Sequence, residues 1–120
     1  MKIAITAQGQ DLSSQIDLRF GRAKWLLVVD TDTGHCEAKD NTVNLNAASG
    51  AGIQTAQNIA NLGIQAVITG NVGPNAFKTL NAAGIKIFLS KASSAQEALD
   101  LFKEEKLQQV TQANVEGHWV

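Results

Sequence analysis

Hydrophobic runs in the first third of the chain predict a strand, a long loop and a hairpin. Residues 2–7 alternate β-formers with small residues and predict a first strand. Residues 11–23 follow neither the helical nor the strand period, so we expect a structured loop, and its length suggests a function. Residues 25–30 are strongly β-prone, and Gly34 supplies the turn from which residues 35–41 return as the second arm of an antiparallel hairpin.

The remaining two thirds alternate helical and apolar segments. Apolar residues at helical spacing predict three helices, which run from the Gly50-Ala51-Gly52 loop to Gly63, from Pro74 to Gly84, and from Ser94 to about Leu107. Ser94 and Glu97 have the spacing of a capping box. The first two helices end in Gly-Ile and lead directly into apolar strands over residues 64–69 and 85–89. Two successive helix-then-strand units imply right-handed crossovers and parallel pairing.

These elements predict an α/β fold with a mixed sheet. An antiparallel hairpin joins a parallel βαβα part, and the helices cover the faces of the sheet. At 120 residues the chain has the size of one domain, which we predict over residues 1–107. Residues 108–120 carry no clear pattern and are predicted to be a C-terminal tail.

Composition narrows the classes of partner. Hydrophobic residues make up 44% of the chain and charged residues 18%, with a formal net charge of -1. Lysines and arginines are scattered singly, which argues against nucleic acid and membrane surfaces as partners. No apolar run approaches the length of a membrane span or a signal-peptide core, so we expect a cytoplasmic protein. Cys36 is the only cysteine, which excludes an intrachain disulfide and a cysteine-rich metal site within one subunit.

Two glycine-containing loops are candidate binding elements. Gly50–Gly52 and Gly70–Gly73 both precede helices, whose free N–H groups and positive dipole end attract anions. In an open α/β sheet such loops gather at the carboxyl ends of the parallel strands, where ligands usually bind. Taken singly, each loop is also explained as a tight turn, because neither matches a phosphate-binding fingerprint.

Arg19 and Arg22 add positive charge from the long first loop. Their guanidinium groups are planar donors able to reach a ligand beyond the strand ends, although two solvated arginines on a loop are an equal alternative. Phe20, between them, is expected in the core in either case.

The residues argue against catalysis. His35 and Cys36 are candidate metal ligands, but neighbouring strand residues point to opposite faces, which favours a structural role. The predicted central strands hold no carboxylates for Mg²⁺, and no glycine elbow surrounds a serine. We therefore expect a binding protein rather than an enzyme.

An ordered set of short motifs resembles a known family. The set is the strand Lys2–Ala7, the segment Arg19–Ala23 entering a strand that ends in Asp30, the Gly50-Ala51-Gly52 helix start, and Gly70–Pro74 followed by Leu80 and Gly84-Ile85. From Met1 to about Leu107 the chain resembles the dinitrogenase iron–molybdenum cofactor biosynthesis family, and its length is that of a small stand-alone member.

The resemblance implies a ribonuclease H-like fold and non-catalytic binding or carriage of an anionic metal–sulfur cluster. The cluster would contain molybdenum, as a Mo–Cu sulfide or an iron–molybdenum cofactor precursor, bound non-covalently and exchanged with a donor or acceptor protein. The candidate cluster-binding residues are Arg19, Phe20, Gly21, Arg22, Gly50, Ala51, Gly52, Ile53, Gly70, Asn71, Val72 and Gly73. Two alternatives are a regulatory module that binds a nucleotide or phosphate in the same loops, and an enzyme of the ribonuclease H-like fold, which the missing strand carboxylates disfavour.

Overall fold

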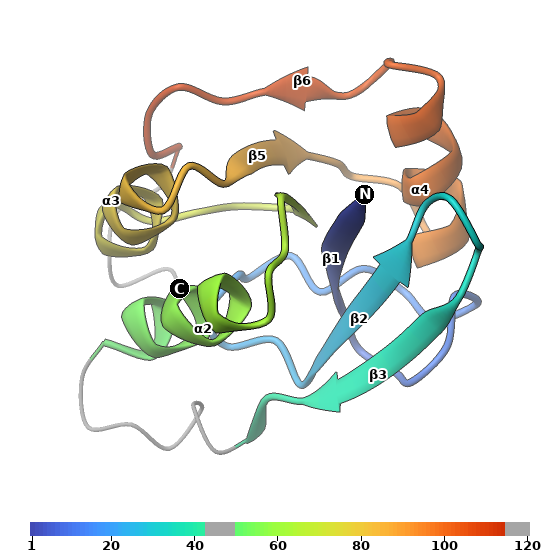
Figure 1. The fold of residues 1–120 in the computed structure, drawn as a ribbon, viewed down its shortest axis with the longest axis horizontal. Helices are drawn as coiled ribbons and strands as arrows, with labels where there is room; N and C mark the ends of the chain where they lie inside the picture. The colour runs from blue at the N-terminus through green and yellow to red at the C-terminus, as the bar shows by residue number, and fades with distance from the viewer. Residues whose placement is uncertain (43–49, 115–120) are drawn as a thin grey trace.

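A computed structural model of the chain describes residues 1–42 and 50–114. Within these residues, six strands form one sheet in the order β3-β2-β1-β4-β5-β6. Figure 1 shows the fold. The strands are β1 (Lys2–Ala7), β2 (Trp25–Asp30), β3 (Cys36–Asp40), β4 (Ala66–Thr69), β5 (Lys86–Leu89) and β6 (Gln108–Gln109). The predicted α/β class and mixed sheet are confirmed, because β1, β4 and β5 pair in parallel while the β2–β3 hairpin is antiparallel.

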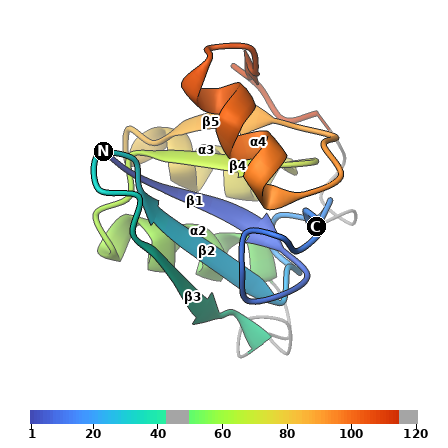
Figure 2. The same ribbon diagram turned by 90° about the vertical axis from the view of Figure 1, so that its right-hand side faces the viewer.

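In the described part of the chain, helices α2, α3 and α4 cover the two faces of the sheet. Figure 2 shows α4 (Ala95–Lys103) on one face, with α2 (Ala51–Asn61) and α3 (Pro74–Ala82) on the other. Alternating residues of β2 divide between two cores: Leu26 and Val28 pack on the α2–α3 side, and Leu27 and Val29 on the α4 side. No helix in the described part of the chain is long and apolar enough to cross a membrane.

The predicted glycine stops end α2 and α3. Gly63 and Gly84 have φ of 73° and 75°, the left-handed conformation that glycine adopts without steric cost. The next N–H groups, of Ile64 and Ile85, donate back to the carbonyls of Ile59 and Leu80. This is the Schellman pattern, so the Gly-Ile pairs end both helices and turn the chain into the next strand.

The predicted end of the last helix is wrong. The helix ends at Lys103 rather than near Leu107, because Glu105 takes the left-handed conformation at φ 58°. The N–H of Lys106 donates to the carbonyl of Leu101 at 2.9 Å, so the same Schellman pattern forms without a glycine. The start is confirmed: Ser94 Oγ accepts a hydrogen bond from the N–H of Glu97 at 3.1 Å.

The described part of the predicted tail belongs to the domain. Residues 108–109 form β6 against β5, Val110 packs on the α2–α3 core, and Asn114 is bonded to the loop after β4. The prediction of a tail rests on the lack of a clear pattern over residues 108–120, whereas hydrogen bonds attach residues 108–110 and Asn114 to the rest of the protein. The rest of that prediction, residues 115–120, lies outside the described residues.

Candidate anion-binding site

The long loop after β1 crosses the edge of the sheet where the parallel strands end. Ile16 forms an antiparallel bridge with Ala7, and Arg19 forms a parallel bridge with Asn71 after β4. The main chain at Asp17 is attached to β1, because its N–H donates to the carbonyl of Thr6 at 2.9 Å and its carbonyl accepts from Thr6 Oγ1 at 2.8 Å. The predicted structured loop is therefore part of the sheet edge.

Two glycines allow this loop to fit between its neighbours. A Cβ on Gly21 would lie 2.6 Å from both Cα and N of Gly52, in the first turn of α2. A Cβ on Gly70 would lie 2.7 Å from the Cα of Leu18. Such contacts are shorter than real Cβ atoms show, so main chain packs directly against main chain at both points.

A buried polar network holds the segment that carries Arg22. Asn41 is 1% exposed, and its amide donates to the carbonyl of Ala23 at 2.8 Å and to that of Gly21 at 3.4 Å. Thr55 of α2 donates to the same Gly21 carbonyl and lies 3.2 Å from Asn41 Oδ1. These bonds attach residues 21–23 to α2. Arg22 is exposed, whereas its neighbours Gly21 and Ala23 are buried.

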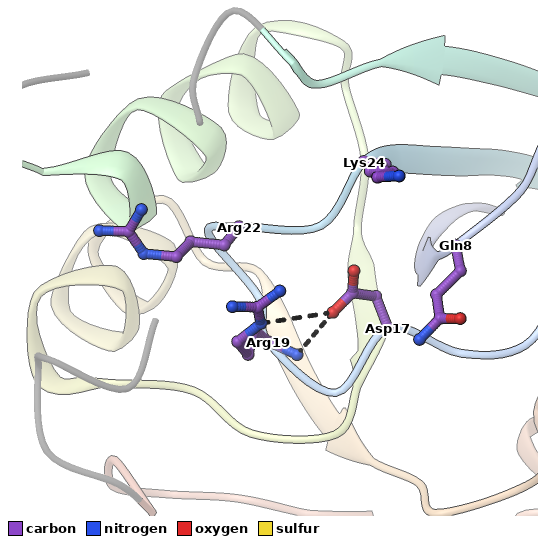
Figure 3. Close-up of a pocket in the computed structure, with 5 residues that line it drawn as sticks. All are labelled: Gln8, Asp17, Arg19, Arg22 and Lys24. Atoms are coloured by element: carbon purple, nitrogen blue, oxygen red, sulfur yellow. Dashed lines mark hydrogen bonds and ion pairs between the residues drawn. The ribbon is translucent and has the colours of Figure 1, made fainter. Parts of the chain in front are cut away.

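The loop and the strand ends form a pocket of about 410 Å³, lined by Gln8, Asp17, Arg19, Arg22 and Lys24 (Figure 3). Three cationic groups and one carboxylate are among the described residues that line it, although the whole chain has a net charge of -1. The volume lies within the usual range for small-molecule sites, about 300–1,000 Å³. The structure thus brings the predicted pair Arg19 and Arg22 into one cavity.

Three lining residues were missed by sequence analysis. Gln8 directly follows β1, and Lys24 directly precedes β2, so both lie at the same sheet edge. Asp17 is 6% exposed, and its Oδ1 accepts a hydrogen bond from the N–H of Arg19 at 3.0 Å. Arg19 Nε lies 4.0 Å from the same oxygen. The signal in the sequence is an Asp two residues before an Arg, which is the spacing of an Asx turn.

The start of α2 lies beside this loop. Gly50 has φ 76°, and within the described residues no side chain caps this terminus and no acidic residue lies in its first turn. Gly52 and Ala51 are buried, with Gly21 packed on them, whereas Gly50 and Ile53 are half-buried. Within the predicted binding loop Gly50–Gly52, Gly50 is therefore the residue that is not buried.

The predicted second loop, Gly70–Gly73, is bonded within the protein. The amide of Asn71 donates to the carbonyl of Leu18 at 3.0 Å, and Asn71 Oδ1 accepts from Lys91 and Asn114. The N–H of Val72 donates to Asn114 Oδ1 at 2.7 Å. These bonds engage the Asn71 side chain and the Val72 N–H, so both groups hold this loop against the first loop and against Asn114.

Two further candidate residues are in the core. Phe20 and Val72 have no exposed surface, and both pack in the α2–α3 cluster. Phe20 anchors the loop between the two arginines, as expected, and neither side chain lines the pocket.

His35 and Cys36 lie at the far end of the hairpin. Cys36 pairs with Val29, four residues along β3 from Asp40, which pairs with Trp25 at the site edge. Burial raises the pKa of the Cys36 thiol, and the nearby Asp11 carboxylate raises it further, which disfavours the thiolate that binds metals. Within residues 1–42 and 50–114, no group of three or more His, Cys, Asp or Glu is placed to hold a metal ion.

A larger depression of about 750 Å³ lies at the opposite edge of the sheet. Its lining mixes the edge-to-face pair Phe88 and Phe102 with Lys86, Lys103 and Glu105. Among the described residues, the smaller pocket is lined by polar and charged side chains alone, which suits a compact anion better than this partly aromatic lining.

The chain is similar in sequence and in fold to known proteins. The family model described as dinitrogenase iron-molybdenum cofactor matches residues 1–105. An uncharacterized protein of Methanocaldococcus jannaschii is 33% identical over 110 residues, 90% of each chain. The apo form of the orange protein from Desulfovibrio gigas superposes with a TM-score of 0.92 at 37% identity, covering 95% of this chain and 96% of that one. A putative NifB protein from Thermotoga superposes with a TM-score of 0.84 at 39% identity, covering 97% and 98%.

Proposed function

This chain belongs to the dinitrogenase iron-molybdenum cofactor family, and from that premise we propose that it binds and carries an anionic metal–sulfur cluster. The cargo is a molybdenum-containing sulfide cluster, of the Mo–Cu type or an iron–molybdenum cofactor precursor. It is bound non-covalently, received from or passed to another protein, and not chemically converted. The resemblance that led to this proposal also implies a ribonuclease H-like fold, which stays a prediction.

The observation that supports the proposal is the cationic pocket. Arg19, Arg22 and Lys24 line one pocket in a chain whose net charge is -1. A sulfide cluster is a polarisable polyanion whose metals already have ligands, so it needs counter-charge and N–H donors more than protein thiolates. Guanidinium groups and the adjacent start of α2 supply both.

The position of the cations also suits a cargo that is exchanged. The Arg19 side chain is 52% exposed, and Arg22 and Lys24 are exposed residues at the pocket rim. Exposed charges attract an anion over a Debye length of about 8–10 Å. Their binding of the anion weakens as the salt concentration rises. This is the behaviour expected of a carrier rather than of a permanent holder.

The first test is an absorbance spectrum with elemental analysis of protein purified gently from its native source. Visible charge-transfer bands with molybdenum, sulfide and a second metal in fixed ratio would identify the cargo. Colourless, metal-free protein that also fails to retain tetrathiomolybdate would contradict the proposal.

The second test uses variants. Arg19→Ala/Arg22→Ala is expected to weaken tetrathiomolybdate binding by at least about tenfold, because two cations leave the pocket. The matched control is Lys86→Ala/Lys103→Ala, which removes the same charge from the opposite edge and should change binding little. Equal weakening in both variants would mean that only net charge matters. Tight, saturable binding of phosphate or a nucleotide in calorimetry would favour the regulatory module instead.

A further inference from the structure

A carboxylate lies inside a pocket built from cations. Asp17 is 6% exposed and lines the same cavity as Arg19, Arg22 and Lys24. Its main chain is fixed to β1 through Thr6, so the side chain has little freedom to leave. Figure 3 shows the carboxylate pointing toward Arg19, with Gln8 beside it.

The turn at this position does not need a negative charge. Asp17 Oδ1 accepts the N–H of Arg19 at 3.0 Å, and an asparagine side chain accepts the same bond in an Asx turn. The separation of 4.0 Å from Arg19 Nε exceeds a hydrogen bond, so that pair interacts through charge rather than through a directed contact.

The charge acts against an anionic ligand. Among the described residues that line the pocket, three cations and one carboxylate give a net charge of +2. An anion in the pocket competes with Asp17 for Arg19 and is repelled by it at short range, where water screens less than at the surface.

We propose that Asp17 is a built-in counter-anion that lowers the affinity of the pocket and makes its cargo releasable. In the empty pocket it neutralises part of the charge of Arg19. In the loaded pocket its repulsion favours release to an acceptor. This inference rests on the proposed function and adds to it a residue that determines affinity.

The test is the affinity of Asp17→Asn for tetrathiomolybdate, measured by titration against the wild type. The substitution keeps the acceptor for the Arg19 N–H and raises the lining charge to +3, so binding is expected to tighten by at least about tenfold. Binding by the variant is also expected to fall more steeply between about 0.02 M and about 0.2 M salt. Asp100→Asn, an exposed carboxylate of α4, is the matched control for net charge and should leave the affinity unchanged.

The outcomes separate this inference from the proposed function. If the wild type binds and Asp17→Asn binds equally or more weakly, Asp17 only positions Arg19 and the inference is overturned while the function stands. If neither binds, both are overturned. Should Asp17→Asn fail to fold by circular dichroism, Asp17→Ser replaces it, because a serine Oγ accepts the same N–H in an ST turn, and the same tightening is expected.

Discussion

Gly21 lies against Gly52 so closely that a Cβ on Gly21 would approach the nitrogen of Gly52 to 2.6 Å. The two residues are 31 positions apart in the sequence, and their contact joins the arginine-bearing loop to the first turn of α2. The loop can approach α2 this closely because Gly21 has no side chain. The start of α2, which is the positive end of the helix dipole, therefore lies beside the loop that carries Arg19 and Arg22.

Gly21→Ala is expected to destabilise the fold by about 3 kcal/mol, because the new methyl group meets main chain that cannot move aside. Denaturant unfolding measures the change. Gly34→Ala is the comparison, since a Cβ there meets nothing within 4 Å and only its φ of 79° is unfavourable, costing about 1–2 kcal/mol. An equal or smaller loss for Gly21→Ala would contradict the close packing.

Asn41→Ala is expected to cost about 2–3 kcal/mol, because it removes the amide that satisfies the buried carbonyl of Ala23. It also removes the acceptor that faces Thr55. The free energy of unfolding is the measurement. Gln57→Ala, at an exposed residue of α2, should stay within about 0.5 kcal/mol of the wild type, and a similar loss at both positions would rule out a specific role for Asn41.

Glu105→Gly is expected to stabilise the protein by about 1 kcal/mol, because Glu105 ends α4 in a left-handed conformation that glycine adopts freely. Glu104→Gly is the control. Glu104 has φ -85°, so glycine there adds flexibility to the unfolded chain, removes an exposed ion pair with Lys106, and should destabilise by about 0.5–1 kcal/mol. Thermal unfolding of the two variants should therefore shift in opposite directions, and a shared direction would refute the assigned helix end.

The reactivity of Cys36 should depend on pH in a defined direction. Burial and Asp11 raise the pKa of its thiol, so the thiolate forms at higher pH in the folded than in the unfolded protein. The folded state then binds its proton more tightly, and stability falls as pH rises from the unfolded thiol pKa through the raised folded pKa.

Labelling with iodoacetamide checks this. The folded protein should react more slowly at neutral pH than the protein unfolded in guanidinium, with the midpoint of its rate profile at higher pH. Cys36→Ala removes the only thiol and sets the background. A folded midpoint at or below the unfolded one would contradict the effect of burial.

The local elements were predictable because their signals are local. Alternation in residues 2–7 and 25–30, the Gly-Ile helix ends and the Ser94 cap depend on neighbours within one turn or strand. The end of α4 was missed for the same reason. A helix end is predicted from a glycine, which adopts the left-handed conformation easily. In α4 a glutamate, Glu105, has that conformation, and the Schellman hydrogen bond from Lys106 to Leu101 forms without a glycine.

The candidate site was only partly predictable. Arg19 and Arg22 stand out by charge, and the pocket contains both. In the sequence, Gly70–Gly73 and Gly50–Gly52 are both glycine-containing loops before a helix. In the structure, the N–H of Val72 donates to Asn114, which lies 42 residues further along the chain. No local sequence pattern predicts such a bond, because the fold determines which residues distant in the chain become hydrogen-bond partners.

The sequence by itself determined the α/β class, the parallel order of the helix–strand units and the presence of two arginines near the strand ends, since these follow from periodicity and turn chemistry. Only the tertiary structure decided which groups share the pocket. Gln8, Asp17 and Lys24 belong to it because the segment over residues 8–24, which joins β1 to β2, folds against the sheet edge. Hydrogen bonds between Asp17 and Thr6 and the packing of Gly21 on Gly52 fix the course of that segment.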